Sequence, residues 1–193
     1  MNLNNAKKIV DLYTQSVASF GEVLSQVSLD NWDQSTPCPD WTIQTLVVHV
    51  VSGEVQLMNL IESETYASPE LSSNVLGPDP MSTWRGTAIN AIAVVQKTPL
   101  EKELPHPTMK LTLERLLGAR ITDNAVHAWD LSQALSQEHI IDPEIAEWAL
   151  NYWLDLYGFL TESEHFAAPL EPTDQSPSTR LLSLLGRRVT ADQ

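Results

Sequence analysis

Apolar residues recur every three or four positions along most of the chain, while the alternating patterns typical of strands are scarce. This spacing puts apolar side chains on one face of an α-helix. The predicted helices cover residues 5–27, 42–63, 82–97, 112–137 and 143–163, followed by a short apolar helix over 179–185. Residues 110–113 are expected to extend only briefly. The pattern therefore predicts an all-α protein.

Prolines and capping residues set the expected helix ends. Asp40 and Thr42 are start signals for the second helix, Ser82 is an expected cap of the third, and Asp142-Pro143 begins the fifth. The proline-rich connections over residues 28–41, 64–81 and 98–111 are too long for a simple up-and-down array. We expect a four-helix bundle with long crossover connections plus an additional C-terminal helix.

Length and charge limit the classes of protein to consider. A chain of 193 residues fits one main domain, which we place at residues 1–165, with a short C-terminal extension at 166–193. The net charge of −14 disfavours nucleic-acid backbones and anionic membrane surfaces. No apolar run approaches the roughly 20 residues that a membrane span needs. With a single cysteine, Cys38, and no signal-peptide pattern at the start, we expect a cytoplasmic protein.

His49 is a polar residue in the most apolar helical segment, Leu46–Val51. A buried imidazole needs a partner, and Gly53 removes side-chain bulk one turn later, where a ligand or a neighbouring helix would approach. The best candidate partners lie in the helix predicted over 112–137, where Asp123 and His127 are four residues apart and therefore share one face.

His49, Asp123 and His127 together form a candidate set of metal ligands across the bundle. Three protein ligands leave coordination positions open, as catalytic sites require. Two imidazoles and a carboxylate suit zinc, nickel, iron or manganese, and ligand type alone does not choose among these metals. Zinc with an open position would lower the pKa of bound water or stabilise a bound thiolate. Asp130, on the same stripe, is expected to hold an imidazole or a helix end in place.

Each of these residues also has a simpler interpretation. Asp123 and His127 can be an exposed pair, and His49 a core histidine with a hydrogen-bond partner. Cys38, before a helix start, can be a nucleophile or metal ligand, or a packed loop residue. Trp41 and Trp129 are candidates for the wall of a substrate cavity, although tryptophans are foremost core residues.

Three segments resemble one known family. Residues 36–42, TPCPDWT, followed by the LVVH of residues 46–49, resemble the opening of proteins related to mycothiol-dependent maleylpyruvate isomerase, within the DinB-like superfamily. The segment 123–131, with Asp123, His127, Trp129 and Asp130, is similar to the second signature of that group. Residues 180–187, RLLSLLGR, resemble the terminal motif of one branch.

The resemblance implies a DinB-like four-helix bundle and a metal held by His49, Asp123 and His127. In the thiol-dependent members of the group, the metal is thought to activate a low-molecular-weight thiol for transfer or isomerisation. This chain departs from the isomerase in two features. Where the resemblance implies a Glu-x-x-x-His arrangement in the isomerase, this chain has Asp123, whose side chain is one methylene shorter. The isomerase also has a substantial C-terminal domain, for which the residues after the fifth helix of this chain offer no counterpart.

Two hypotheses about function follow. The first is a metal-dependent transferase or isomerase of the thiol-using kind, with a small-molecule substrate or thiol as its partner. The second is a non-catalytic bundle, a homodimeric stress-response or interaction protein, in which the three residues bind a metal for stability or form only a buried hydrogen-bond cluster.

Overall fold

The computed structural model describes residues 3–63, 65–69, 71–162 and 167–189. Within these ranges the elements are α1 (Leu3–Leu24), α2 (Ile43–Glu62), a 3-10 helix η1 (Ser73–Leu76), α3 (Pro80–Lys97), β1 (Glu103–Leu104), β2 (Leu111–Thr112), α4 (Leu113–Ala134), α5 (Pro143–Asp155), α6 (Tyr157–Glu162) and α7 (Pro177–Leu184). The predicted all-α architecture is confirmed, since the two strands form only a small antiparallel pair.

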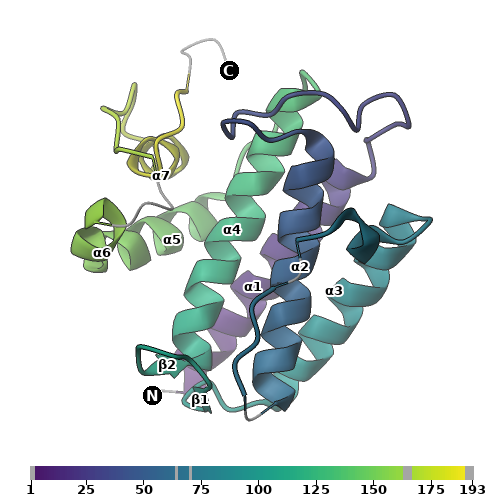
Figure 1. The fold of residues 1–193 in the computed structure, drawn as a ribbon. Helices are drawn as coiled ribbons and strands as arrows, with labels where there is room; N and C mark the ends of the chain where they lie inside the picture. The colour runs from purple at the N-terminus through teal and green to yellow at the C-terminus, as the bar shows by residue number, and fades with distance from the viewer. Residues whose placement is uncertain (1–2, 64, 70, 163–166, 190–193) are drawn as a thin grey trace.

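The helices α1 to α4 lie side by side as a bundle (Figure 1). Both α1 and α2 pack against α3 and α4, which places α1 and α2 on a diagonal of the bundle. The α1–α2 connection therefore crosses one end of the bundle. The helices α5, α6 and α7 lie to the side of α4, with α7 packed on α5 (Figure 1). Among the described residues, no helix combines the length and apolar character that a membrane span needs.

Local capping explains the observed helix starts. Thr42 caps α2 by accepting the backbone N–H of Thr45, as expected of a start signal. The third helix begins earlier than predicted, because Asp79 rather than Ser82 is its cap and accepts the backbone N–H of Ser82 at 3.1 Å. Pro80 then occupies the first helical position, where its missing N–H costs nothing.

The predicted fifth helix is broken in the structure. Its last turn tightens at Leu156, whose N–H bonds to the carbonyls of Trp153 and Leu154, and a second short helix starts at Tyr157. The predicted boundary between residues 165 and 166 lies outside the described residues.

A buried ionic cluster joins three helices of the bundle. The Glu54 carboxylate on α2 is fully buried and accepts hydrogen bonds from Arg120 and Asn124 of α4 and from the Tyr13 hydroxyl of α1. The Arg120 guanidinium passes directly over Gly53, where a Cβ atom would lie 2.2 Å from Nη1. The absent side chain at Gly53 therefore makes room for a side chain of a neighbouring helix, one of the two possibilities that the sequence indicates.

We predict opposite effects of Gly→Ala at two helical positions. Gly86→Ala in α3, where nothing lies within 4 Å of the added Cβ, should stabilise the protein by about 0.5–1 kcal/mol through helix propensity. Gly53→Ala should instead destabilise it by about 1–3 kcal/mol, because the methyl group overlaps Arg120. Urea unfolding of both variants measures the difference. A stabilised Gly53→Ala protein would show that Arg120 is free to move away.

Candidate metal centre

The structure brings His49, Asp123 and His127 together between α2 and α4. Asp123 Oδ1 lies 3.1 Å from His49 Nε2 and 3.3 Å from His127 Nε2. The three ligand atoms all lie within 4.8 Å of one another. Ligand atoms about 2.0–2.1 Å from one tetrahedral ion are separated by about 3.3–3.4 Å, so these two separations fit a single divalent ion.

Arg120 fixes the orientation of Asp123. Its Nη1 donates to Asp123 Oδ2 at 2.7 Å, which leaves Oδ1 facing the two histidines. Burial alone would raise the pKa of Asp123, but attraction to His49, Arg120 and His127 outweighs it and holds that pKa well below its usual range. Asp123 is therefore an anionic carboxylate with one oxygen directed at the candidate metal position.

Asp130 holds the ring of His127 from the other side. The Nδ1 atom of His127 lies 2.9 Å from Asp130 Oδ2, so an N–H at Nδ1 leaves Nε2 directed at Asp123. Burial would lower the pKa of His127, but Asp123, with further hydrogen bonds to Asp130 and Cys38, raises it well above its usual value. In the metal-free protein His127 therefore carries a proton between two carboxylates at neutral pH.

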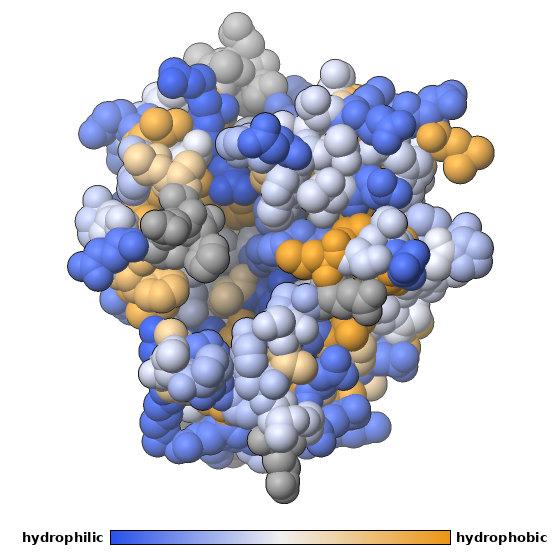
Figure 2. Space-filling view, in the orientation of Figure 1, coloured by the Kyte–Doolittle hydropathy of each residue, from blue (hydrophilic) through white to orange (hydrophobic). Residues whose placement is uncertain are grey.

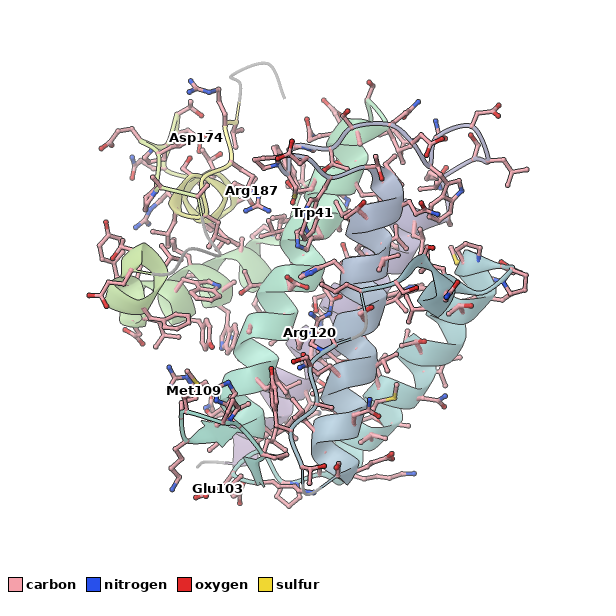
Figure 3. All side chains as sticks on the ribbon, in the orientation of Figure 1. Trp41, Glu103, Met109, Arg120, Asp174 and Arg187 are labelled. Carbon is pink, nitrogen blue, oxygen red and sulfur yellow. The ribbon has the colours of Figure 1, made fainter. Side chains whose placement is uncertain are left out.

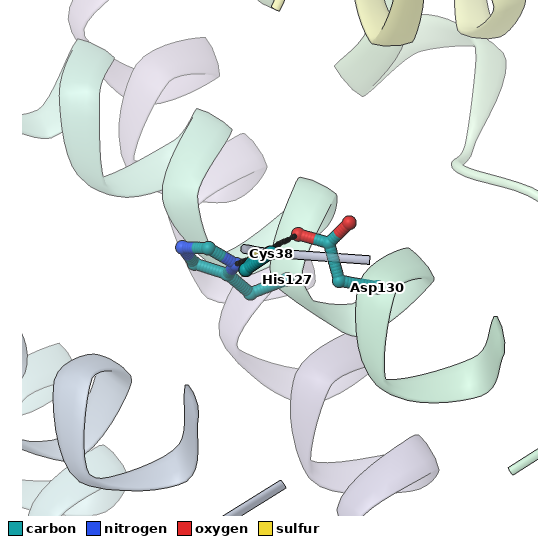
Figure 4. Close-up of side chains that lie close together, drawn as sticks. All are labelled: Cys38, His127 and Asp130. Carbon is teal, nitrogen blue, oxygen red and sulfur yellow. Dashed lines mark hydrogen bonds and ion pairs between the residues drawn. The ribbon is translucent and has the colours of Figure 1, made fainter. Parts of the chain in front are cut away.

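A second group of possible ligands, Cys38, His127 and Asp130, lies beside the first (Figure 4). The Cys38 thiol donates to Asp130 Oδ2 at 3.3 Å, and Arg187 donates to Oδ2 at 2.8 Å and to Oδ1 at 3.3 Å. Although burial opposes ionisation, hydrogen bonds from His127 and the charge of Arg187 lower the pKa of Asp130 to about 2. Both oxygens of the Asp130 carboxylate therefore already accept hydrogen bonds from neighbouring side chains.

The His49, Asp123 and His127 side chains line a cavity of about 630 Å³. Trp41 forms part of its wall and packs on both rings, with centroid distances of 4.9 Å to His49 and 5.7 Å to His127. Arg187 contributes another part of the wall from the segment after α7. Figure 3 shows Trp41 and Arg187 beside the upper half of α4, with Arg120 below them between α2 and α4. Figure 2 shows hydrophobic residues bordering a hollow in this face of the molecule.

The predicted site residues separate into two places. Trp41 lies at the candidate metal position, whereas Trp129, 6% exposed, lines a different cavity between α4 and α7. Sequence reasoning did not identify Arg120 or Arg187 as part of the site. Arg120 stands three residues before Asp123, a helical spacing that predicts contact between the two side chains. Arg187 is distant in sequence from the other site residues, and its only sequence signal is that it ends the RLLSLLGR segment.

Comparison with known proteins gives the family. The model of the mycothiol maleylpyruvate isomerase N-terminal domain matches residues 13–132, which include all three candidate ligands. Two Mycobacterium tuberculosis proteins, the uncharacterized protein MT0763 of strain CDC 1551 / Oshkosh and the uncharacterized protein Rv0738 of strain ATCC 25618 / H37Rv, are each 30% identical to the chain over 176 residues. Each alignment covers 89% of this chain and 93% of the relative. No solved structure matches the chain. With its helical bundle and this match over more than half of its length, the chain belongs to the DinB-like family of the mycothiol maleylpyruvate isomerase N-terminal domain.

Proposed function

We propose that the protein is a divalent-metal-dependent enzyme of the thiol-using kind, a transferase or isomerase, in which His49, Asp123 and His127 hold the metal. The observation that carries this proposal is the meeting of three ligand atoms within 4.8 Å of one another on the wall of a cavity of about 630 Å³. Three protein ligands beside a cavity leave room for a further ligand, as catalytic sites require. The family supports the proposal, because its name couples the domain to a thiol.

The position of the metal follows from which groups have free lone pairs. Asp130 accepts from Arg187, His127 and Cys38, so coordination there would break several hydrogen bonds at once. At Asp123, by contrast, Oδ1 faces only the two imidazoles. His49 is also the most accessible of the ligands, with a third of its side chain exposed (33%). We therefore place the ion at His49, Asp123 and His127.

The surrounding residues have separate roles in this proposal. A divalent ion, with zinc or nickel as the expected metals, supplies Lewis-acid chemistry that lowers the pKa of a coordinating thiol. Arg120 keeps Asp123 Oδ1 in place, Asp130 keeps the Nε2 atom of His127 directed at the ion, and Trp41 packs against both imidazole rings. A low-molecular-weight thiol, together with a small-molecule substrate, fits a cavity of this volume. A cytoplasmic location and a homodimer stay predictions from the sequence.

Metal content tests the ligand set directly. The wild-type protein, purified without metal-affinity resin, should contain about one divalent ion per chain by elemental analysis. His49→Ala and His127→Ala should each lose the ion, because two remaining ligands bind weakly, whereas His106→Ala, which changes a loop histidine outside the cavity lining, should retain it. The proposal would be contradicted if the wild-type protein contained no metal and its melting temperature changed neither with a chelator nor with added zinc or nickel.

Metal binding should release a proton from His127. Because its pKa in the metal-free protein lies well above 6.5, coordination through Nε2 must expel about one proton per ion at pH 7. The apparent affinity should then fall about tenfold for each unit that the pH is lowered. Calorimetric titration in two buffers of different ionisation enthalpy counts the protons.

The same raised pKa makes a prediction for the stability of the metal-free protein. The contribution of protonated His127 is complete below pH 6.5 and is lost as the pH rises through the raised value. Chemical unfolding between pH 6 and pH 9 should follow this trend in the wild type and lose it in His127→Ala. Metal binding without proton release, or a wild type and variant with the same trend, would show that His127 is neutral before the ion arrives.

Thiol binding distinguishes an enzyme from a structural metal site. Mycothiol or another low-molecular-weight thiol at about a hundred times its Kd should raise the melting temperature of the metal-loaded protein by about 5–10 °C. The S-methylated thiol should have no such effect, and neither should the free thiol added to His49→Ala. A protein that keeps its metal but responds to no thiol would favour the non-catalytic bundle.

A further inference from the structure

A second cavity, of about 580 Å³, lies between the C-terminal half of α4, the α4–α5 connection and α7. It shares no lining residue with the cavity at His49, Asp123 and His127 among the residues described. Its walls are largely apolar and include Trp129, Ile141, Pro143, Pro177 and Leu182. The thiol chemistry proposed above makes no use of this space.

Trp129 gives the second cavity a specific hydrogen-bond donor. The indole is 6% exposed, and among the described residues its N–H has no hydrogen-bond partner, yet it is not one of the fully buried unpaired atoms, so it keeps access to solvent. A ligand that fills the cavity and excludes water from this N–H must supply an acceptor, because an unpaired donor away from water costs free energy. The neighbouring Ser132 hydroxyl is engaged elsewhere, since it donates to the Trp129 carbonyl at 2.7 Å. A ligand with an oxygen acceptor would supply the partner that the protein does not.

The charges around the second cavity select the type of ligand. The described residues that line it include Glu138 and Asp174 but neither lysine nor arginine. Hydrogen bonds from Ser176 and Thr179 lower the pKa of Asp174, so it is anionic and its oxygens are already engaged. Burial lowers the pKa of His139, which keeps this ring uncharged at neutral pH. Phosphates and carboxylates are therefore repelled, and the site offers an anion no counter-charge.

We propose that the second cavity binds uncharged, largely apolar ring compounds that carry a carbonyl or hydroxyl oxygen, with the Trp129 N–H as the donor to that oxygen. The apolar walls supply the contact area, and the indole N–H fixes the orientation. The site does not depend on a metal at His49, Asp123 and His127.

The naphthalene ketone Prodan tests this site, because it is uncharged, has a carbonyl acceptor, and its emission responds to polarity and hydrogen bonding. The protein should bind one equivalent of Prodan saturably. Trp129→Phe keeps the aromatic wall but removes the N–H, so the affinity should fall about fivefold, equivalent to about 1 kcal/mol, and the bound probe should emit at a shorter wavelength. Trp148→Phe, the same exchange outside the cavity lining, should change neither quantity.

Two further measurements locate the probe and define the ligand class. Gln133→Trp, a substitution on the cavity wall, should block binding by filling the space, while thiol and metal binding stay unchanged. The anionic dye anilinonaphthalenesulfonate should not displace Prodan. Binding that is unaffected by both Trp129→Phe and Gln133→Trp, or the absence of saturable binding, would overturn the proposal. Efficient displacement by the anionic dye would overturn the assigned ligand class.

Discussion

The buried guanidinium of Arg120 is the group on which both the bundle and the candidate metal centre depend. A charge in an apolar interior is costly unless it is paired, and Arg120 pairs on one side with Glu54 and on the other with Asp123. Glu54 in turn binds Tyr13 of α1, so the pairing requires α1, α2 and α4 to keep a fixed register. The position of Asp123 is therefore set by the same contacts that hold the helices together.

The charges near the centre are arranged so that one negative charge is left at the histidines. Glu54, Asp123 and Asp130 are three carboxylates, and Arg120 and Arg187 neutralise two of them. In the metal-free protein, protonated His127 compensates the remaining charge. A divalent ion at His49, Asp123 and His127 would take over that compensation and would compete with the proton for the same position.

The segment from α7 to Arg187 forms walls of two cavities of different character. Leu182 faces the apolar space beside Trp129, while Leu185, Gly186 and Arg187 line the cavity of the metal centre. The chain turns from one cavity to the other at Gly186, whose φ of 79° lies in the left-handed region that favours glycine. The short C-terminal segment thus contributes a paired cation to one site and apolar surface to the other.

Apolar periodicity, prolines and caps act locally, and a polar residue in an apolar helix requires a partner, so the helices, the crossover connections and the three candidate ligands could be predicted from the sequence. The break after Asp155 and the Asp79 cap show the limit of that reasoning at helix ends. Two contacts could not be predicted in this way: Arg187 reaches Asp130 from 57 residues away, and Trp129 faces a cavity apart from that of Trp41. Such contacts depend on which helix faces meet across the bundle, and the spacing of residues along one helix does not encode that choice.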